Sequence, residues 1–98
     1  MAKELKRIVK INKTKGEITN ILKKSGWYKG ENGDYYYLIQ TIYDNTGYEI
    51  GETTISVYPK NNKILVSVDK MDFPKGNEWQ AKVELEQYAD FLKEILDE

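Results

Sequence analysis

The sequence contains no histidine and no cysteine. Histidine is the usual general base and the commonest metal ligand, and cysteine supplies thiolate nucleophiles, metal ligands and disulfides. The three serines, Ser25, Ser56 and Ser67, therefore lack their usual activating base, and none lies in a G-x-S-x-G elbow. These absences predict that the protein is not an enzyme and binds no cofactor.

The acidic side chains do not supply a convincing reactive site either. Asp44, Glu49 and Glu52 lack the spacing of a calcium-binding loop, and we interpret them as turn and strand-edge residues. Asp69 and Asp72 fall in a loop where nothing indicates that they converge. We therefore predict no metal site.

Long apolar runs are missing as well. No stretch approaches the ~18 apolar residues that span a bilayer, and the N-terminal segment MAKELKRIVKINK has no apolar signal core. We therefore expect a cytoplasmic protein that does not enter a membrane. The length of 98 residues, with 40% hydrophobic and 32% charged residues, predicts a single globular domain over 1–98.

Charge is present in both signs but is unevenly distributed along the chain. Residues 1–30 hold nine basic and two acidic residues, whereas residues 31–98 hold six basic and fourteen acidic ones. The overall charge of −1 therefore hides a net of +7 followed by a net of −8. Either the basic segment lies against the acidic C-terminal helix, or the protein has a charge-polarised surface that attracts phosphates or acidic protein at one pole.

Two helices are indicated by capping signals and apolar spacing. Thr14 and Glu17 form a capping box that predicts a helix over 15–25, ended by Gly26. Asn77, with Gln80 three residues later, predicts the cap of a helix over 78–96. Its expected apolar stripe comprises Ala81, Leu85, Tyr88, Leu92 and Ile95, widened by Phe91 and Leu96. Residues 1–13 fit either a short helix or a strand arm.

Three strands are predicted over 35–43, 48–58 and 63–69, with a short extra strand possible at 27–29. The fold class is then α+β, with the order α-β-β-β-α, a three-stranded antiparallel meander and the long C-terminal helix on one face. This order resembles the double-stranded-RNA-binding domain. That family opens its last helix with Lys-Lys-x-Ala-Lys, whereas residues 78–82 read Glu-Trp-Gln-Ala-Lys, so we set the family aside.

A hairpin loop at 45–47, with Gly47 in the left-handed position, fixes the expected register of the first two strands. Residue 44 then pairs with 48, which places Tyr35 opposite Val57 and Tyr37 opposite Ile55. The expected core face consists of Tyr35, Tyr37, Ile39, Ile55, Val57, Ile64, Val66 and Val68. The opposite face would carry Tyr36, Leu38, Gln40, Ile42, Ile50, Glu52, Thr54, Ser56, Tyr58, Leu65 and Ser67.

This second face is too apolar for an ordinary solvated sheet face. Either residues 1–13 fold over it, or a partner or a second copy binds it. Together with the absent catalytic groups, it predicts a small non-catalytic protein that binds another protein stoichiometrically. Such proteins include inhibitors encoded by phages or mobile elements, and the acidic helix suggests a nucleic-acid-processing enzyme as the target. The predicted partner-binding residues are Tyr36, Leu38, Ile42, Ile50, Tyr58, Leu65 and Trp79.

Nucleic-acid binding is the alternative function. The predicted contacts are the basic residues Lys3, Lys6, Arg7, Lys10, Lys13 and Lys15. Aromatic side chains on a sheet can stack bases, but the predicted second face offers Tyr36 and Tyr58 with no lysine or arginine between them, and Glu52 would repel phosphate. The residues of this face therefore favour a protein partner over nucleic acid.

Overall fold

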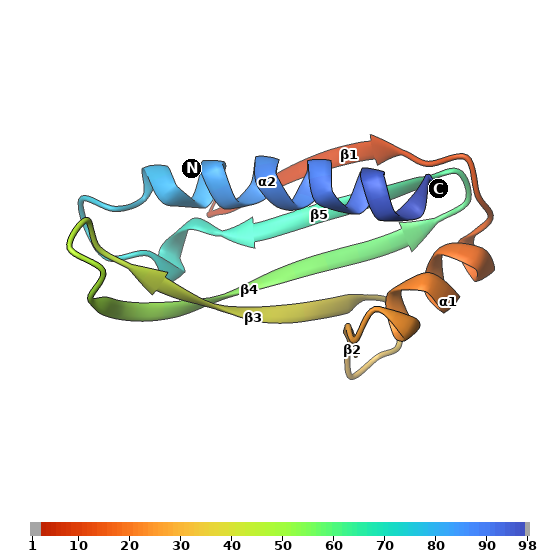
Figure 1. Cartoon of the computed structure of the whole chain (residues 1–98). Coiled ribbons are helices and arrows are strands. Elements are labelled where there is room, and N and C mark those ends of the chain that lie inside the picture. The colour runs from red at the N-terminus through yellow and green to blue at the C-terminus, as the bar shows by residue number, and fades with distance from the viewer. Residues whose placement is uncertain (1–2, 98) are drawn as a thin grey trace.

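A computed structural model of the chain describes residues 3–97 (Figure 1). The elements are β1 (Glu4–Lys10), α1 (Lys15–Lys24), β2 (Tyr28–Lys29), β3 (Tyr36–Tyr43), β4 (Glu49–Lys60), β5 (Lys63–Asp69), the 3-10 helix η1 (Lys70–Asp72) and α2 (Trp79–Leu96). The strands form one antiparallel sheet in the order β1-β5-β4-β3-β2. Within the described residues, neither helix is long and apolar enough to cross a membrane.

The α+β class is confirmed, and the three predicted strands form the antiparallel meander β3-β4-β5. The sheet has five strands and not three, because β1 and the possible short strand, β2, add one at each edge. The ambiguous segment 1–13, of which residues 1 and 2 lie outside the described part, contains β1, and β1 pairs with β5 along its whole length. It therefore extends the sheet and does not fold over the second face. Leu5 and Val9 point toward α2, whereas Ile8 points the other way and is 63% exposed.

Helix α1 closes one end of the sheet, as its capping box predicts (Figure 1). The Thr14 hydroxyl accepts from the Glu17 backbone N–H at 3.2 Å, and a Glu17 carboxylate oxygen accepts from the Thr14 N–H at 3.0 Å. The bond from the Thr14 backbone N–H, followed by the effect of the Thr14 side chain, lowers the pKa of the Glu17 carboxyl. Ile18 and Leu22 are fully buried, and Gly26 ends the helix with φ of 87°.

The register between β3 and β4 differs from the prediction because β4 contains a bulge. Near the turn the predicted pairing holds, since Tyr43 pairs with Glu49. The next pair is Ile42 with Gly51, so Ile50 is the extra residue. Beyond the bulge every pair is shifted by one position, and Val57 lies opposite Tyr36. A shift of one residue exchanges the two faces of β3, because side chains alternate along a strand.

The shift corrects the predicted faces of β3. Tyr36 is 3% exposed and Ile42 is 1% exposed, so both belong to the core. Ile39, predicted to be buried, is 54% exposed, and Tyr35 and Tyr37 are only half-buried. The rest of the prediction is confirmed, because the core face includes Ile55, Val57, Ile64, Val66 and Val68, all at 0% exposure.

Helix α2 covers this core face, packing mainly on β1 and β5 (Figure 1). Its buried residues are Ala81, Leu85, Ala89, Leu92 and Leu96. The stripe therefore differs slightly from the predicted one, since Tyr88 and Ile95 are half-buried and Phe91 is 48% exposed. The predicted side-chain cap is wrong: the N-cap is Glu78 without a capping bond, and the Asn77 side chain instead accepts from Gln80 Nε2 at 3.1 Å.

Candidate nucleic-acid interface

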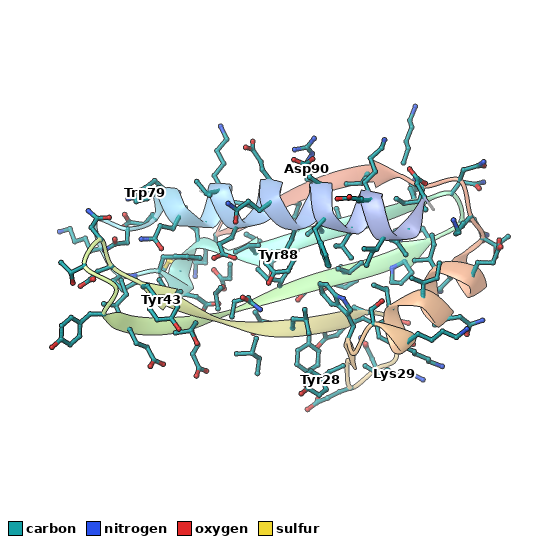
Figure 2. The ribbon with its side chains drawn as sticks, in the orientation of Figure 1. Tyr28, Lys29, Tyr43, Trp79, Tyr88 and Asp90 are labelled. Carbon is teal, nitrogen blue, oxygen red and sulfur yellow. The ribbon has the colours of Figure 1, made fainter. Side chains whose placement is uncertain are left out.

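Four tyrosines gather on the face of the sheet that α2 does not cover. The rings of Tyr35 and Tyr58 are 5.3 Å apart, those of Tyr35 and Tyr37 are 6.1 Å apart, and those of Tyr37 and Tyr28 are 5.6 Å apart. All three pairs are tilted by 33° to 42°. We call these four side chains the tyrosine platform. The outermost, Tyr28, is 59% exposed and points away from the sheet at the end that carries α1 (Figure 2).

Local structure explains how these rings meet. The bulge at Ile50 turns Tyr35 and Tyr37 to the open face, and β2 places Tyr28 opposite Tyr37. The Tyr35 ring lies directly on Gly30, where an added Cβ would sit 2.3 Å from the ring atom Cε1. Only glycine leaves room for the ring at this position.

A row of three lysines borders the platform. Lys10 pairs with Lys63, and Lys63 pairs with Lys60 across the β4–β5 turn. Because side chains alternate along a strand, all three lysines lie on the open face. Each lies two residues along its own strand from Ile8, Leu65 or Tyr58. Among residues 3–97, no salt bridge includes any of these three lysines. Like charges directly opposite one another destabilise a sheet, so the row does not stabilise the fold.

A shallow hollow of about 380 Å³ lies beside the rings. The side chains that line it are Lys29, Glu31, Tyr35, Tyr37, Thr54, Ser56 and Tyr58. Thr54 and Ser56 come from β4, and their small hydroxyl side chains leave the neighbouring rings accessible. The hollow combines aromatic surfaces, which can stack bases, with hydroxyl groups and the Lys29 ammonium, which can bind phosphate. It also holds one carboxylate, that of Glu31, which balances the charge of Lys29.

Carboxylates lie near the platform as well as lysines, because Glu31 lines the hollow beside Lys29 and Glu4 acts on Tyr58. Burial, with smaller effects from Glu4 and Tyr35, raises the pKa of the Tyr58 phenol above its usual value. Glu52, which we expected to repel phosphate, pairs with Thr41 four residues along β3 from Tyr37. At ~3.4 Å per residue, it lies roughly 14 Å from Tyr37 along the strand, beyond the Debye length of ~8 Å.

The structure divides the basic residues that we predicted for nucleic-acid binding. Lys6 and Lys10 lie on the open face, whereas Arg7 points to the α2 side. Lys3 lies at the other end of β1, beside Glu4 and Asp69. The remaining two are outside the sheet: Lys13 donates to the Leu96 carbonyl, and Lys15 begins α1.

The seven residues predicted for partner binding do not form one surface. Tyr36 and Ile42 are buried in the core, so their prediction as surface contacts is wrong. The reason is that the bulge shifts the pairing of β3 by one residue and turns both side chains inward. Leu38 also turns to the α2 side, and Ile50 packs against the core. Only Tyr58 and Leu65 share the open face. Trp79 is 57% exposed and lies at the start of α2, at the end of the molecule away from α1 (Figure 2).

Other predicted features have structural roles. Trp27 is 5% exposed, with its ring edge-on to Tyr88 at a centroid distance of 6.1 Å, so it belongs to the core. The Asp44 carboxylate accepts from Thr46 Oγ1 at 2.7 Å and from the Thr46 and Tyr48 backbones, which holds the hairpin turn. Within residues 3–97, no group of three or more acidic side chains is placed to hold a metal ion.

Sequence reasoning missed Tyr28, Tyr35, Tyr37, Lys60 and Lys63 as site residues. The lysines had a detectable signal, because Lys60 and Lys63 flank a two-residue turn and so must lie opposite each other. The tyrosines had none, because their face depends on the bulge. No protein-family model and no curated protein sequence matches this chain.

Proposed function

We propose that this protein binds single-stranded nucleic acid on its open sheet face. The observation that carries the proposal is the tyrosine platform bordered by the lysine row. Bases would stack on the rings while Lys10, Lys60 and Lys63 meet successive phosphates. Stacking on an aromatic side chain contributes about 1–3 kcal/mol per base and does not depend on sequence.

The shape of the surface supports a single strand over a duplex. The rings lie on a sheet face where a splayed base can reach them, whereas the bases of a duplex are stacked on one another and shielded. More basic residues lie at the same end of the molecule, on α1 and in β2, and they enlarge the positive field there: Lys15, Lys23, Lys24 and Lys29. A positive field of this kind speeds association with an anionic strand.

The test is fluorescence anisotropy with labelled oligo-dT and oligo-rU of ~10 nucleotides, with a duplex of equal length as a control. We expect both single strands to bind, and Tyr37→Ala to weaken binding by roughly 5- to 100-fold. The matched control is Tyr43→Ala, because Tyr43 is equally a β3 tyrosine on the open side but lies outside the platform. Equal effects of the two substitutions, or no binding at about 50 mM salt, would overturn the proposal.

The lysine row can be tested separately through salt dependence. Three phosphate contacts on a single strand predict a slope of log K against log salt near −2, from about −0.7 per contact. Lys63→Gln should make that slope shallower by about 0.7 and weaken all sequences alike. Lys75→Gln, on an exposed loop residue before α2, is the control and should leave the slope unchanged.

The binding of a protein partner, and the narrower role of an inhibitor of a nucleic-acid-processing enzyme, stay predictions. The surface first assigned to that role is not formed, because Tyr36 and Ile42 are buried. A different part of the molecule favours protein binding.

A further inference from the structure

The two edges of the sheet differ in how they are protected. The β1 edge carries Glu4, Lys6, Arg7 and Lys10, and charges of this kind keep an edge from pairing with other chains. On the other edge, β2 pairs only with Tyr36 and Tyr37. The rest of β3, Leu38–Tyr43, has no charged residue and pairs with no other described strand on that side. We call this segment the free edge.

The backbone of the free edge offers hydrogen bonds outward. The Gly30 N–H donates to the Tyr35 carbonyl at 2.8 Å, so the backbone groups of Tyr35 point toward β2. Residues two apart point their backbone groups to the same side, which places those of Ile39 and Thr41 on the free edge. The Tyr43 carbonyl, next in the series, accepts from Gln80 Nε2 at 3.2 Å. Ile39 and Thr41 therefore present two donors and two acceptors to an incoming strand.

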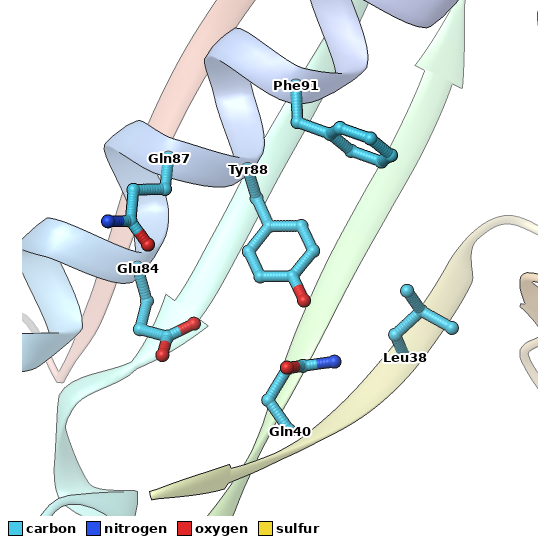
Figure 3. A pocket seen from close by; sticks show the side chains of 6 residues that line it. All are labelled: Leu38, Gln40, Glu84, Gln87, Tyr88 and Phe91. Carbon is cyan, nitrogen blue, oxygen red and sulfur yellow. The ribbon is translucent and has the colours of Figure 1, made fainter.

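A groove of about 400 Å³ runs beside the free edge, between β3 and α2 (Figure 3). Leu38 and Gln40 line it from β3, and Glu84, Gln87, Tyr88 and Phe91 line it from α2. The groove exists because α2 packs mainly on β1 and β5 and so leaves β3 outside its contact area. Every second side chain of an added strand would enter this groove.

The chemistry of the groove changes along its length. Gln80, near the start of α2, contacts Tyr43 at the end of β3, so α2 and β3 run in opposite directions. Glu84 therefore lies toward the Gln40 end, and Phe91 lies toward Leu38. Burial raises the pKa of the Glu84 carboxyl, and no ion pair among the described residues includes it. One end of the groove thus suits a cation and the other an apolar side chain.

We infer that the free edge and its groove bind an extended segment of a partner protein as an added antiparallel strand. The segment would place a basic side chain opposite Gln40 and Glu84 and, two residues later, an apolar side chain against Leu38 and Phe91. Backbone bonds to Ile39 and Thr41 would give affinity, and the two groove positions would give specificity. Phe91 and Ile39, which are 48% and 54% exposed, would both lose contact with water.

The test is an acetylated and amidated peptide, Thr-Val-Thr-Lys-Thr-Phe, whose six residues match the free edge and stop before β2. It is titrated into the whole protein while backbone amide NMR signals are followed. We expect shifts at Ile39 and Thr41 and none at the tyrosine platform. The same peptide with glutamate in place of lysine should bind at least about fivefold more weakly. In Glu84→Lys the preference should reverse, with the glutamate peptide binding more tightly than the lysine peptide.

A second pair of variants tests the backbone bonds. Thr41→Pro removes a backbone N–H that points away from β4, and an edge position of this kind tolerates proline. The substitution should weaken peptide binding by about fivefold or more. Thr41→Val keeps the N–H and should bind like the unaltered protein. Absence of peptide binding at millimolar concentration, or an unchanged preference in Glu84→Lys, would overturn the inference. The inference would also be overturned if the unaltered protein sedimented as a dimer and Thr41→Pro as a monomer, because a second copy would then occupy the free edge.

This outcome is independent of nucleic-acid binding, since the two surfaces share no residue. Oligonucleotide affinity should be the same in Glu84→Lys and in the unaltered protein. Loss of both activities in that variant would point to misfolding, which the amide spectrum would reveal.

Discussion

The two faces of the sheet contain tyrosines that are adjacent in the sequence but differ completely in environment. Tyr36 is 3% exposed beneath α2, whereas Tyr35 and Tyr37 stand half-exposed on the open face. The covered face is otherwise aliphatic, with Ile55, Val57 and Val66 at its centre, while the open face combines rings with lysines. The difference shows that the environment of an aromatic residue here depends on strand register and not on residue type.

The largest effect should come from deleting Ile50, the extra residue of the bulge. Without it, pairing that starts at the Asp44–Tyr48 turn would bring Tyr35 and Tyr37 to the core face and expel Tyr36 and Ile42. A domain of this size has a free energy of unfolding of only about 5–10 kcal/mol, so we expect cooperative unfolding to be lost at 25 °C. Urea denaturation followed by circular dichroism measures this. A deletion variant with normal stability would show that the bulge does not set the faces.

The next effect compares the neighbouring tyrosines directly. Tyr36→Ala should lower the free energy of unfolding by about 3–5 kcal/mol because it leaves a cavity in the core. Tyr37→Ala should lower it by about 1 kcal/mol or less, because the ring is half-exposed. Urea denaturation of the two variants side by side gives both values. Equal losses would contradict the assignment of the two faces.

A smaller effect is expected at the β3–β4 turn. The bond from the Thr46 hydroxyl, followed by backbone bonds from Tyr48 and Thr46, lowers the pKa of the Asp44 carboxyl below its usual 3.8. A carboxyl group whose pKa is lowered by folding stabilises the protein when the pH lies above its pKa in the unfolded chain. This stabilisation is lost as the pH falls through its pKa in the folded protein. Asp44→Ala should therefore lower the Tm at pH 7, and the gap should close toward pH 2. The control is Thr19→Ala, which removes the side chain of a half-buried threonine in α1. Its effect on the Tm should not depend on pH in this way.

The smallest effect should be a gain in stability at the groove. Burial raises the pKa of Glu84 above its usual 4.5, so the charged form is the less stable one in the folded protein. This loss of stability is absent when the pH lies below the pKa of Glu84 in the unfolded chain. It is complete once the pH exceeds the pKa in the folded protein. Glu84→Gln should therefore raise the Tm slightly at pH 7 and leave it unchanged near pH 4. Calorimetry at the two pH values, with exposed Glu86→Gln as the control, would test this.

Local signals in the sequence were sufficient for most elements. The capping box at Thr14 and Glu17 predicted α1, Gly26 predicted its end, and Gly47, with φ of 89°, predicted the hairpin turn. These features succeeded because each depends on residues within one turn of the chain. The edge position of β1 could not be predicted, since its mixed pattern of Leu5, Arg7 and Val9 fits a helix or a strand equally well.

The candidate site was predicted less well, because the open face depends on pairing between distant segments. A single bulged residue, Ile50, reversed the faces of β3 and removed Tyr36 and Ile42 from the expected surface. Bulges leave little trace in a sequence, since the extra residue obeys neither the pattern before it nor the pattern after it. The basic N-terminal third did lead to Lys6 and Lys10, and both lie on the open face.

The sequence by itself determined the class of fold, the two helices, the three long strands and the lack of histidine and cysteine chemistry. Those properties follow from composition and from contacts between residues close in the chain. Only the tertiary structure decided which tyrosines meet, that Lys10 lies beside Lys63, and that one edge of β3 stays unpaired. The physical reason is that strand register and helix placement are fixed by the packing of the whole core, which no local pattern contains.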